Sequence, residues 1–110
     1  MLFLVELDRI NPGSTPTPES ARTFIEQVIF PTLDRAEQLA AEGTILSGGV
    51  AVGQIAVRFI VEADSSEHVD RIVTSLPVWT VAEIKVTPLI SFGERREHVQ
   101  ALLDRFSAKL

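Results

Sequence analysis

The sequence predicts a single α+β domain with the element order β-α-β-β-α-β, followed by one further helix. Three observations lead to this prediction. Apolar residues alternate in four short segments, they recur at three- and four-residue steps in three longer segments, and turn residues separate the segments. The chain has 110 residues, of which 45% are hydrophobic, which is enough for one domain with its own core.

The first strand is predicted over residues 2–8, where apolar side chains point alternately to the two faces of a sheet. A loop rich in Pro, Gly, Ser and Thr follows over about 11–17. A long helix is then expected over about 18–42. Thr17 suits its N-cap, and Gly43 suits the left-handed residue that ends it.

One residue interrupts this helical pattern. Pro31 has no N–H to donate to the Gln27 carbonyl, so we expect a kink near this point. Such a kink either wraps the helix around a sheet or opens a pocket under the bend.

The next segment, TILSGGVAVGQIAVRFIVEA, is typical of a β-hairpin. Its two strands are predicted over about 44–51 and 54–62, with Gly53 in the tight turn. The pair Gly48 and Gly49 indicates a bulge or a close approach of two backbones.

The segment ADSSEHVDRIVTSLP predicts the second helix. Asp64 and Glu67 form a capping-box-like start, and Pro77 stops the helix. A fourth strand is expected over about 81–90, and a C-terminal helix over about 92–108.

This element order is the ferredoxin-like arrangement, and the right-handed crossover rule gives the sheet order 4-1-3-2. The face expected under the two crossover helices is wholly apolar: Phe3, Val5, Leu7, Ile55, Val57, Phe59, Val61, Ile84 and Val86. The opposite face mixes aliphatic and charged residues: Leu2, Leu4, Glu6, Gln54, Ala56, Arg58, Ile60, Glu83, Lys85 and Thr87.

The mixed face predicts a homodimer. A single sheet would leave Leu2, Leu4 and Ile60 in water, so we expect two sheets to meet face to face with two-fold symmetry. The apolar stripe of the C-terminal helix must also dock, either on its own subunit or on the partner.

Four charged residues of the mixed face, Glu6, Arg58, Glu83 and Lys85, could pair across the strands. One interpretation is a charge-balanced set that holds the register of a dimer. The other is a polar pocket in which one carboxylate acts as a base.

Composition makes several partners and chemistries unexpected. The net charge is −5 and the basic residues are scattered, so neither nucleic acid nor an anionic membrane is an expected partner. There is no cysteine and no GxSxG motif, which removes thiol chemistry and the serine-hydrolase elbow. His68 and His98 lie on different predicted helices with no third ligand type beside them, so we expect no metal site. With no signal peptide or apolar run of about 20 residues, we expect a cytoplasmic protein.

Three segments resemble the muconolactone isomerase-like proteins of the dimeric α+β barrel superfamily. They are MLFLV at the start, AEGT at the end of the long helix, and LPVWTVAEIKVTPL, which is the most specific of the three. The resemblance implies a ferredoxin-like monomer, an oligomer built on dimers and a small-ligand pocket between sheet and helices. It also implies a cofactor-free shift of a double bond in a small unsaturated lactone, which requires one base.

The chain departs from these enzymes in its polar residues. Leu4 stands where their opening strand carries a histidine, and Arg58 is the only charged residue in the hairpin stretches that match their pocket. Two kinds of protein fit this departure: a paralogue of these enzymes that acts on another substrate, or a protein that only binds a small ligand.

Three residues are the candidate site. We predict that Glu83 is the base, that Arg58 holds the carboxylate of a small acid, and that Trp79 walls the pocket. Trp79 could instead be an aromatic plug at the end of the sheet. The alternative function is a non-catalytic barrel that binds a small ligand or serves as an accessory subunit.

Overall fold

The elements follow the predicted order in a computed structural model that describes all residues 1–110. They are β1 (Leu2–Arg9), α1 (Pro18–Phe24), the π-helical turn η1 (Ile25–Ile29), α2 (Phe30–Ala41), β2 (Ile45–Val50), β3 (Ala56–Glu62), α3 (Ser66–Thr74), the 3-10 turn η2 (Pro77–Val81), β4 (Ala82–Leu89) and α4 (Phe92–Ser107). The four strands form one antiparallel sheet in the order β2-β3-β1-β4, which confirms the predicted order.

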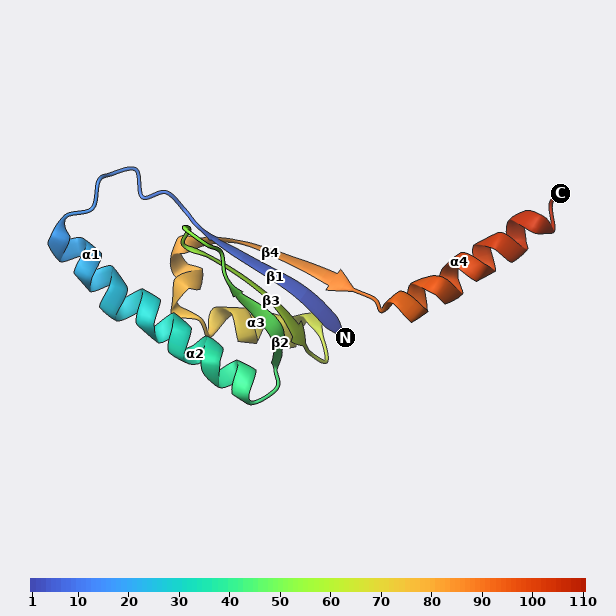
Figure 1. Cartoon of the computed structure of the whole chain (residues 1–110), viewed down its shortest axis with the longest axis horizontal. Coiled ribbons are helices and arrows are strands. Elements are labelled where there is room, and N and C mark those ends of the chain that lie inside the picture. The colour runs from blue at the N-terminus through green and yellow to red at the C-terminus, as the bar shows by residue number, and fades with distance from the viewer.

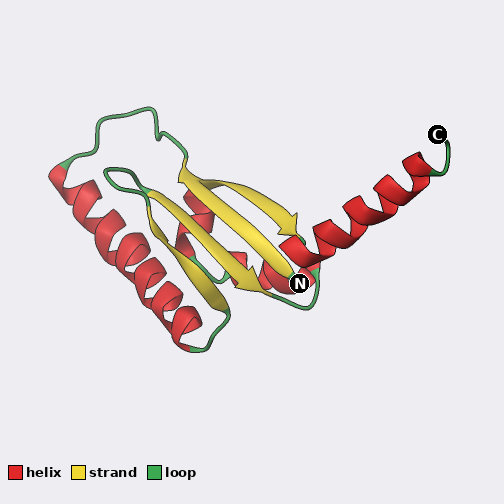
Figure 2. Cartoon of the chain, turned by 45° about the vertical axis from the view of Figure 1, so that its right-hand side comes forward, coloured by secondary structure: helices red, strands yellow, loops and turns green.

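The helices α2 and α3 cover one face of the sheet and leave the other open, while α1 extends beyond the end of the sheet (Figures 1 and 2). The core lies between them and joins the apolar face of β1 and β3 to residues of α2, α3 and η2. Its members are Phe3, Val5, Leu7, Phe59, Val61, Leu39, Ala63, Val69, Ile72, Val73, Leu76 and Val78. The predicted apolar face is therefore the core face.

Two predicted positions on the sheet are corrected, Ile55 and Val86. Strand β3 begins at Ala56, because residues up to Ile55 belong to a turn in which the Gln54 N–H donates to the Ala51 carbonyl. Ile55 is therefore 40% exposed, whereas Ala56 pairs with Asp8 on the mixed face, as predicted, and is 3% exposed. Val86 is 39% exposed, since α3 leaves β4 partly uncovered.

The disturbance expected at Pro31 takes the form of a π-helical turn. The Phe30 N–H donates to the Ile25 carbonyl, five residues back, and regular α-helix resumes in α2. Widening the turn before a proline accommodates both its missing donor and the bulk of its ring. Thr17 caps the helix as predicted, and Gly43 has the predicted positive φ, 82°.

The start of α3 is one residue later than predicted. Ser65 is the N-cap, and its hydroxyl accepts from the His68 N–H, so the capping box on Asp64 is wrong. Serine at position 65 is as good a cap as aspartate at 64, and sequence preference alone does not separate them. Pro77 ends α3 as predicted, but it also opens η2, the turn that carries Trp79 into β4.

One buried hydrogen bond fixes η2 against α2. The Thr32 side chain is 4% exposed, and its Oγ1 accepts from the Val78 N–H at 3.0 Å. The N-cap of η2, Leu76, has no side chain that could satisfy this donor.

We therefore expect Thr32→Val to lower the free energy of unfolding by about 1–3 kcal/mol, because it leaves the Val78 N–H buried without a partner. Urea unfolding followed by circular dichroism would measure the loss. Thr32→Ser keeps the hydroxyl and is the matched control. Equal stability of Thr32→Val and the wild type would contradict this role.

Helix α4 projects away from the rest of the chain (Figure 1). Every residue from Ser91 to Leu110 is exposed, including the apolar stripe of Val99, Leu102, Leu103 and Phe106. Its start is a capping box: the Ser91 hydroxyl accepts from the Glu94 N–H, and the Glu94 carboxylate accepts from the Ser91 N–H. The docking expected for this stripe does not occur within one subunit. No helix of the chain has both the length and the apolar character needed to cross a membrane.

Candidate functional site

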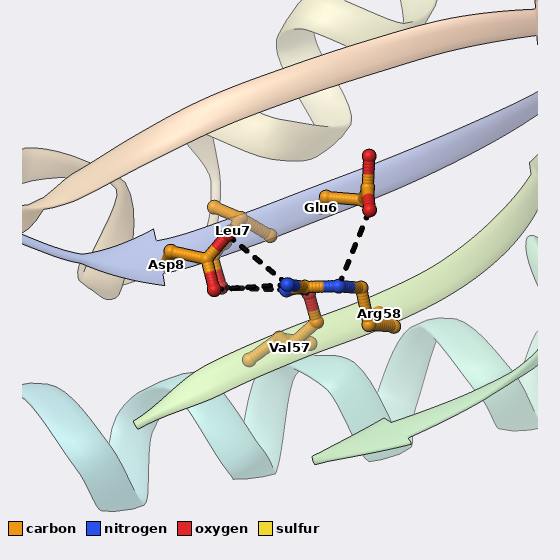
Figure 3. Close-up of polar contacts among 5 residues, drawn as sticks. All are labelled: Glu6, Leu7, Asp8, Val57 and Arg58. Atoms are coloured by element: carbon orange, nitrogen blue, oxygen red, sulfur yellow. Dashed lines mark hydrogen bonds and ion pairs between the residues drawn. The ribbon is translucent and has the colours of Figure 1, made fainter. Parts of the chain in front are cut away.

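Arg58 lies between two carboxylates on the open face of the sheet (Figure 3). Glu6 and Arg58 are cross-strand partners, and Asp8 lies two residues further along β1, on the same face. Arg58 Nη2 donates to the two carboxylate oxygens of Asp8 at 2.9 and 3.1 Å, and its Nε lies 3.4 Å from Glu6 Oε1. Its Nη1 donates to the carbonyls of Leu7 and Val57. Both terminal nitrogens of this guanidinium therefore donate to protein acceptors, and Nε is ion-paired with Glu6.

Glu83 and Lys85 extend this polar cluster onto β4. Glu83 lies opposite Asp8 in the register of β1 and β4, and Lys85 lies opposite Glu6. Both side chains are exposed, and neither has an oppositely charged group within 4.0 Å. The predicted pairing of Glu6 with Arg58 is present, whereas Glu83 and Lys85 pair with nothing in one subunit.

Aliphatic side chains occupy the other half of the open face. Leu2, Leu4, Ile60 and Leu89 are each half-buried, and the register of β1 with β3 and β4 makes them neighbours. The open face thus divides into an apolar half near the start of β1 and a charged half near its end.

Trp79 lies on the opposite side of the sheet from Arg58 and Glu83. It is 41% exposed and lines a cleft of about 470 Å³ between α3 and β4. Phe3, Val73 and Ile84, residues of the helix-covered face and of α3, line the same cleft. Within one subunit, the structure brings Arg58 and Glu83 to one face and places Trp79 against another.

A second cleft, of about 230 Å³, lies between α2 and the β2-β3 hairpin. Its walls are mostly apolar and include Leu33, Ala36, Ile45, Val57 and Phe59. The hydroxyl of Thr32 also lines it but already accepts from the backbone of η2, so the cleft offers few free polar groups.

No three histidine, aspartate or glutamate side chains are grouped so that they could hold a metal ion.

Sequence reasoning missed Asp8 as the principal partner of Arg58. A signal was present, because Asp8 has the same strand parity as Glu6 and therefore faces the same side. Sequence reasoning also missed the stacking of the Arg9 guanidinium on the Phe24 ring, at 4.0 Å from its centroid. That contact joins a strand to a helix across the loop, and no local pattern specifies it.

Two solved structures share this fold. The crystal structure of a muconolactone isomerase matches with a TM-score of 0.66 and 22% identity, over 83% of this chain and 90% of that one. A 5-chloro-2-hydroxyhydroquinone dehydrochlorinase from Burkholderia phenoliruptrix, in complex with 2,5-dihydroxybenzoquinone, matches with a TM-score of 0.61 and 23% identity. This second match covers 86% of this chain and 98% of that one. No curated protein sequence matches the chain.

The sequence itself matches a family model over most of its length. The model is that of muconolactone delta-isomerase, and the match spans residues 1–95, which includes every strand and all helices except most of α4. The resemblance carried by the three short segments is therefore confirmed. The chain belongs to the muconolactone delta-isomerase family.

Proposed function

We propose that this protein is a cofactor-independent isomerase-type enzyme that moves a proton within a small unsaturated or cyclic acid. Family membership supports the reaction class. We place the active site on the open face because of one pair of residues there, Glu83 and Lys85. A carboxylate and an ammonium, each without an ionic partner, stand two residues apart on the same face of β4.

Glu83 is the base in this proposal. A double-bond shift needs one group that removes a proton beside a carbonyl and returns it elsewhere on the same molecule. An unpaired carboxylate can accept that proton without first breaking an ion pair. Glu6 and Asp8 are less suited to this step because both are bound to Arg58.

The carboxylate of the substrate needs a cation, and two are within reach on the face. A substrate carboxylate would have to displace Asp8 to reach Arg58, whose two terminal nitrogens both have acceptors and whose Nε is ion-paired with Glu6. Lys85 has no such competitor, which supports Lys85 as the first contact and Arg58 as the residue that fixes Glu6 and Asp8. Trp79 lies on the other face, so we give it no part in proton transfer within one subunit.

We further propose that a second copy covers the open face. In one subunit the face is open to water, and its aliphatic half would gain from being buried against another sheet. A two-fold dimer would place the charged halves in a closed space, where a base and a substrate anion interact more strongly than in water. The cytoplasmic location expected from the sequence stays a prediction.

Glu83→Gln is the test of the base. We expect it to reduce kcat by about 10²- to 10⁴-fold, the usual contribution of a positioned general base, with the fold unchanged. Lactones and small unsaturated acids would first be screened by thermal shift, and ligands that bind would be followed for double-bond migration by ultraviolet absorbance. Glu67→Gln, an exposed residue of α3 without an ion pair, is the control. Full turnover by Glu83→Gln would remove Glu83 from this role.

The alternative function is a non-catalytic small-ligand-binding or accessory protein. The cleft between α2 and the β2-β3 hairpin favours it, because eight of its twelve lining residues are hydrophobic, so that it can enclose an apolar ligand, with Glu37 as its one charged residue. Ligands that stabilise the protein without being converted, equally in wild type and Glu83→Gln, would support this alternative.

A further inference from the structure

A third cleft, of about 420 Å³, lies beneath the proline-rich loop that connects β1 to α1. Its size is within the range of about 300–1,000 Å³ that is usual for small-molecule sites. Ten residues line it, among them Arg9, Phe24, Ile25, Ile29 and Ile55. One side chain of this set is charged, and it is a cation.

That cation has no anionic partner. Arg9 is half-buried, its guanidinium carbon lies 4.0 Å from the centroid of the Phe24 ring, and no carboxylate lies within 4.0 Å of it. The two other half-buried arginines are both engaged by polar side chains, Arg58 by Asp8 and Glu6 and Arg35 by Gln38 and Ser75.

The position of Arg9 is fixed by its backbone and by the ring beneath it. Its N–H donates to the Ile55 carbonyl at 3.1 Å, which holds the end of β1 against the hairpin turn. The flat guanidinium on the Phe24 face is restricted in orientation, so little further order is lost when its outer edge binds an anion.

Apart from Arg9, Ser14 and Ser20, the lining of the cleft is apolar and incompletely covered. Ile25 is 41% exposed and Ile55 is 40% exposed, and both face the cleft beside Ile29. Ile25 and Ile29 are the first and last residues of the π-helical turn. Such turns are rare and occur frequently at functional sites.

We propose that this cleft binds a small aromatic carboxylate, with its carboxylate on Arg9 and its ring against Ile25, Ile29 and Ile55. A planar carboxylate matches the two-pronged donor edge of a guanidinium, and a flat ring covers the apolar surface that is exposed. The cleft lies on the helix-covered side of the sheet, away from Glu83 and Lys85. The proposal is therefore independent of the proton-transfer function.

The test is a titration of the full chain with benzoate, followed by isothermal calorimetry and by two-dimensional NMR of the backbone amides. We expect the amides of residues 9–29 and of Ile55 to shift. Benzyl alcohol, which keeps the ring but carries no charge, should bind at least about tenfold more weakly, since a charge-assisted hydrogen bond contributes about 1.5–3 kcal/mol.

Two variants separate the role of Arg9 from general charge effects. Arg9→Met keeps the long stem over Phe24 and should weaken benzoate binding by about tenfold or more. Arg71→Met removes an exposed, unpaired arginine of α3 and should leave binding unchanged. If Arg9→Met proves unfolded by circular dichroism, Arg9→Lys, which loses the planar fork but keeps the charge, takes its place with a smaller expected loss.

Three outcomes would overturn the proposal: no benzoate binding at millimolar concentration, equal binding by the Arg9 variant and the wild type, or shifts confined to β4 around Glu83 and Lys85. Glu83→Gln distinguishes this proposal from the enzymatic one, because it should reduce kcat by about 10²- to 10⁴-fold and leave benzoate binding intact.

Discussion

Replacing Gly48 with alanine is expected to lower the free energy of unfolding by about 2–5 kcal/mol, the combined cost of a disfavoured backbone conformation and of overpacking. Gly48 has a φ of 150°, a conformation that residues with a side chain rarely adopt. A Cβ at this position would lie 2.5 Å from Phe59 Cβ and 2.6 Å from Phe59 Cα, and would also collide with the Arg58 carbonyl oxygen. Phe59 is a core residue, so the strand cannot move aside without disturbing the core.

The neighbouring glycine provides the control for this prediction. Gly49→Ala places the same methyl group one residue further along β2, where nothing lies within 4 Å and φ is not in the positive range. Urea unfolding of both variants should show a large loss of stability for Gly48→Ala and little change for Gly49→Ala. Equal stabilities would show that β2 does not approach β3 as described.

Leu103→Glu is expected to shift the protein from an assembly of at least two copies to a monomer of 12.1 kDa. The stripe of α4 is expected to dock and does not dock on its own subunit, so the partner of the proposed dimer is left as its docking surface. Leu103 is 57% exposed in one subunit, so its replacement should act on that contact and not on the fold. In a two-fold dimer each substitution changes the interface at two symmetry-related positions. Two lost leucine contacts amount to about 3 kcal/mol or more, or about 100-fold in the dissociation constant.

Sedimentation equilibrium would measure this change directly. Ala101→Glu introduces the same side chain two residues away, on the opposite side of α4 from Val99, Leu103 and Phe106, and should leave the assembly intact. A wild-type protein that sediments at 12.1 kDa would contradict the homodimer proposal. Dissociation by Ala101→Glu to the same extent would contradict the assignment of the docking face.

The order of elements and the sheet topology could be predicted because each depends on short-range patterns and on one general rule of handedness. The alternation of Phe3, Val5 and Leu7 predicts their burial, and the three are at most 1% exposed. The three observations behind the fold prediction are thus sufficient for the architecture. The positions of caps and turns are less determined, as Ser65 and Ile55 show, because a shift of one residue changes local preferences very little.

The candidate site was predicted only in outline. The mixed face and its pairing of Glu6 with Arg58 follow from strand parity and register. The dominance of Asp8 over Glu83 as the partner of Arg58 does not, because it depends on how a long side chain extends along the strands. Trp79 was placed beside Glu83 by nearness in sequence, but η2 separates them by turning the chain before β4 begins.

The π-helical turn has a consequence for insertions and deletions in this segment. Within it the chain returns to its hydrogen-bonding partner after five residues instead of four. Five residues of a π-helical turn rotate the chain by nearly the same angle as four residues of an α-helix, so we expect deletion of one residue between Ile25 and Ile29 to leave a regular helix with α1 and α2 in phase. A deletion in the regular part of α2 would instead rotate α1 by about 100° relative to the sheet, and Phe24 would leave the underside of Arg9. The wall of the cleft therefore tolerates a change of length within the π-helical turn better than one in the helix that follows it.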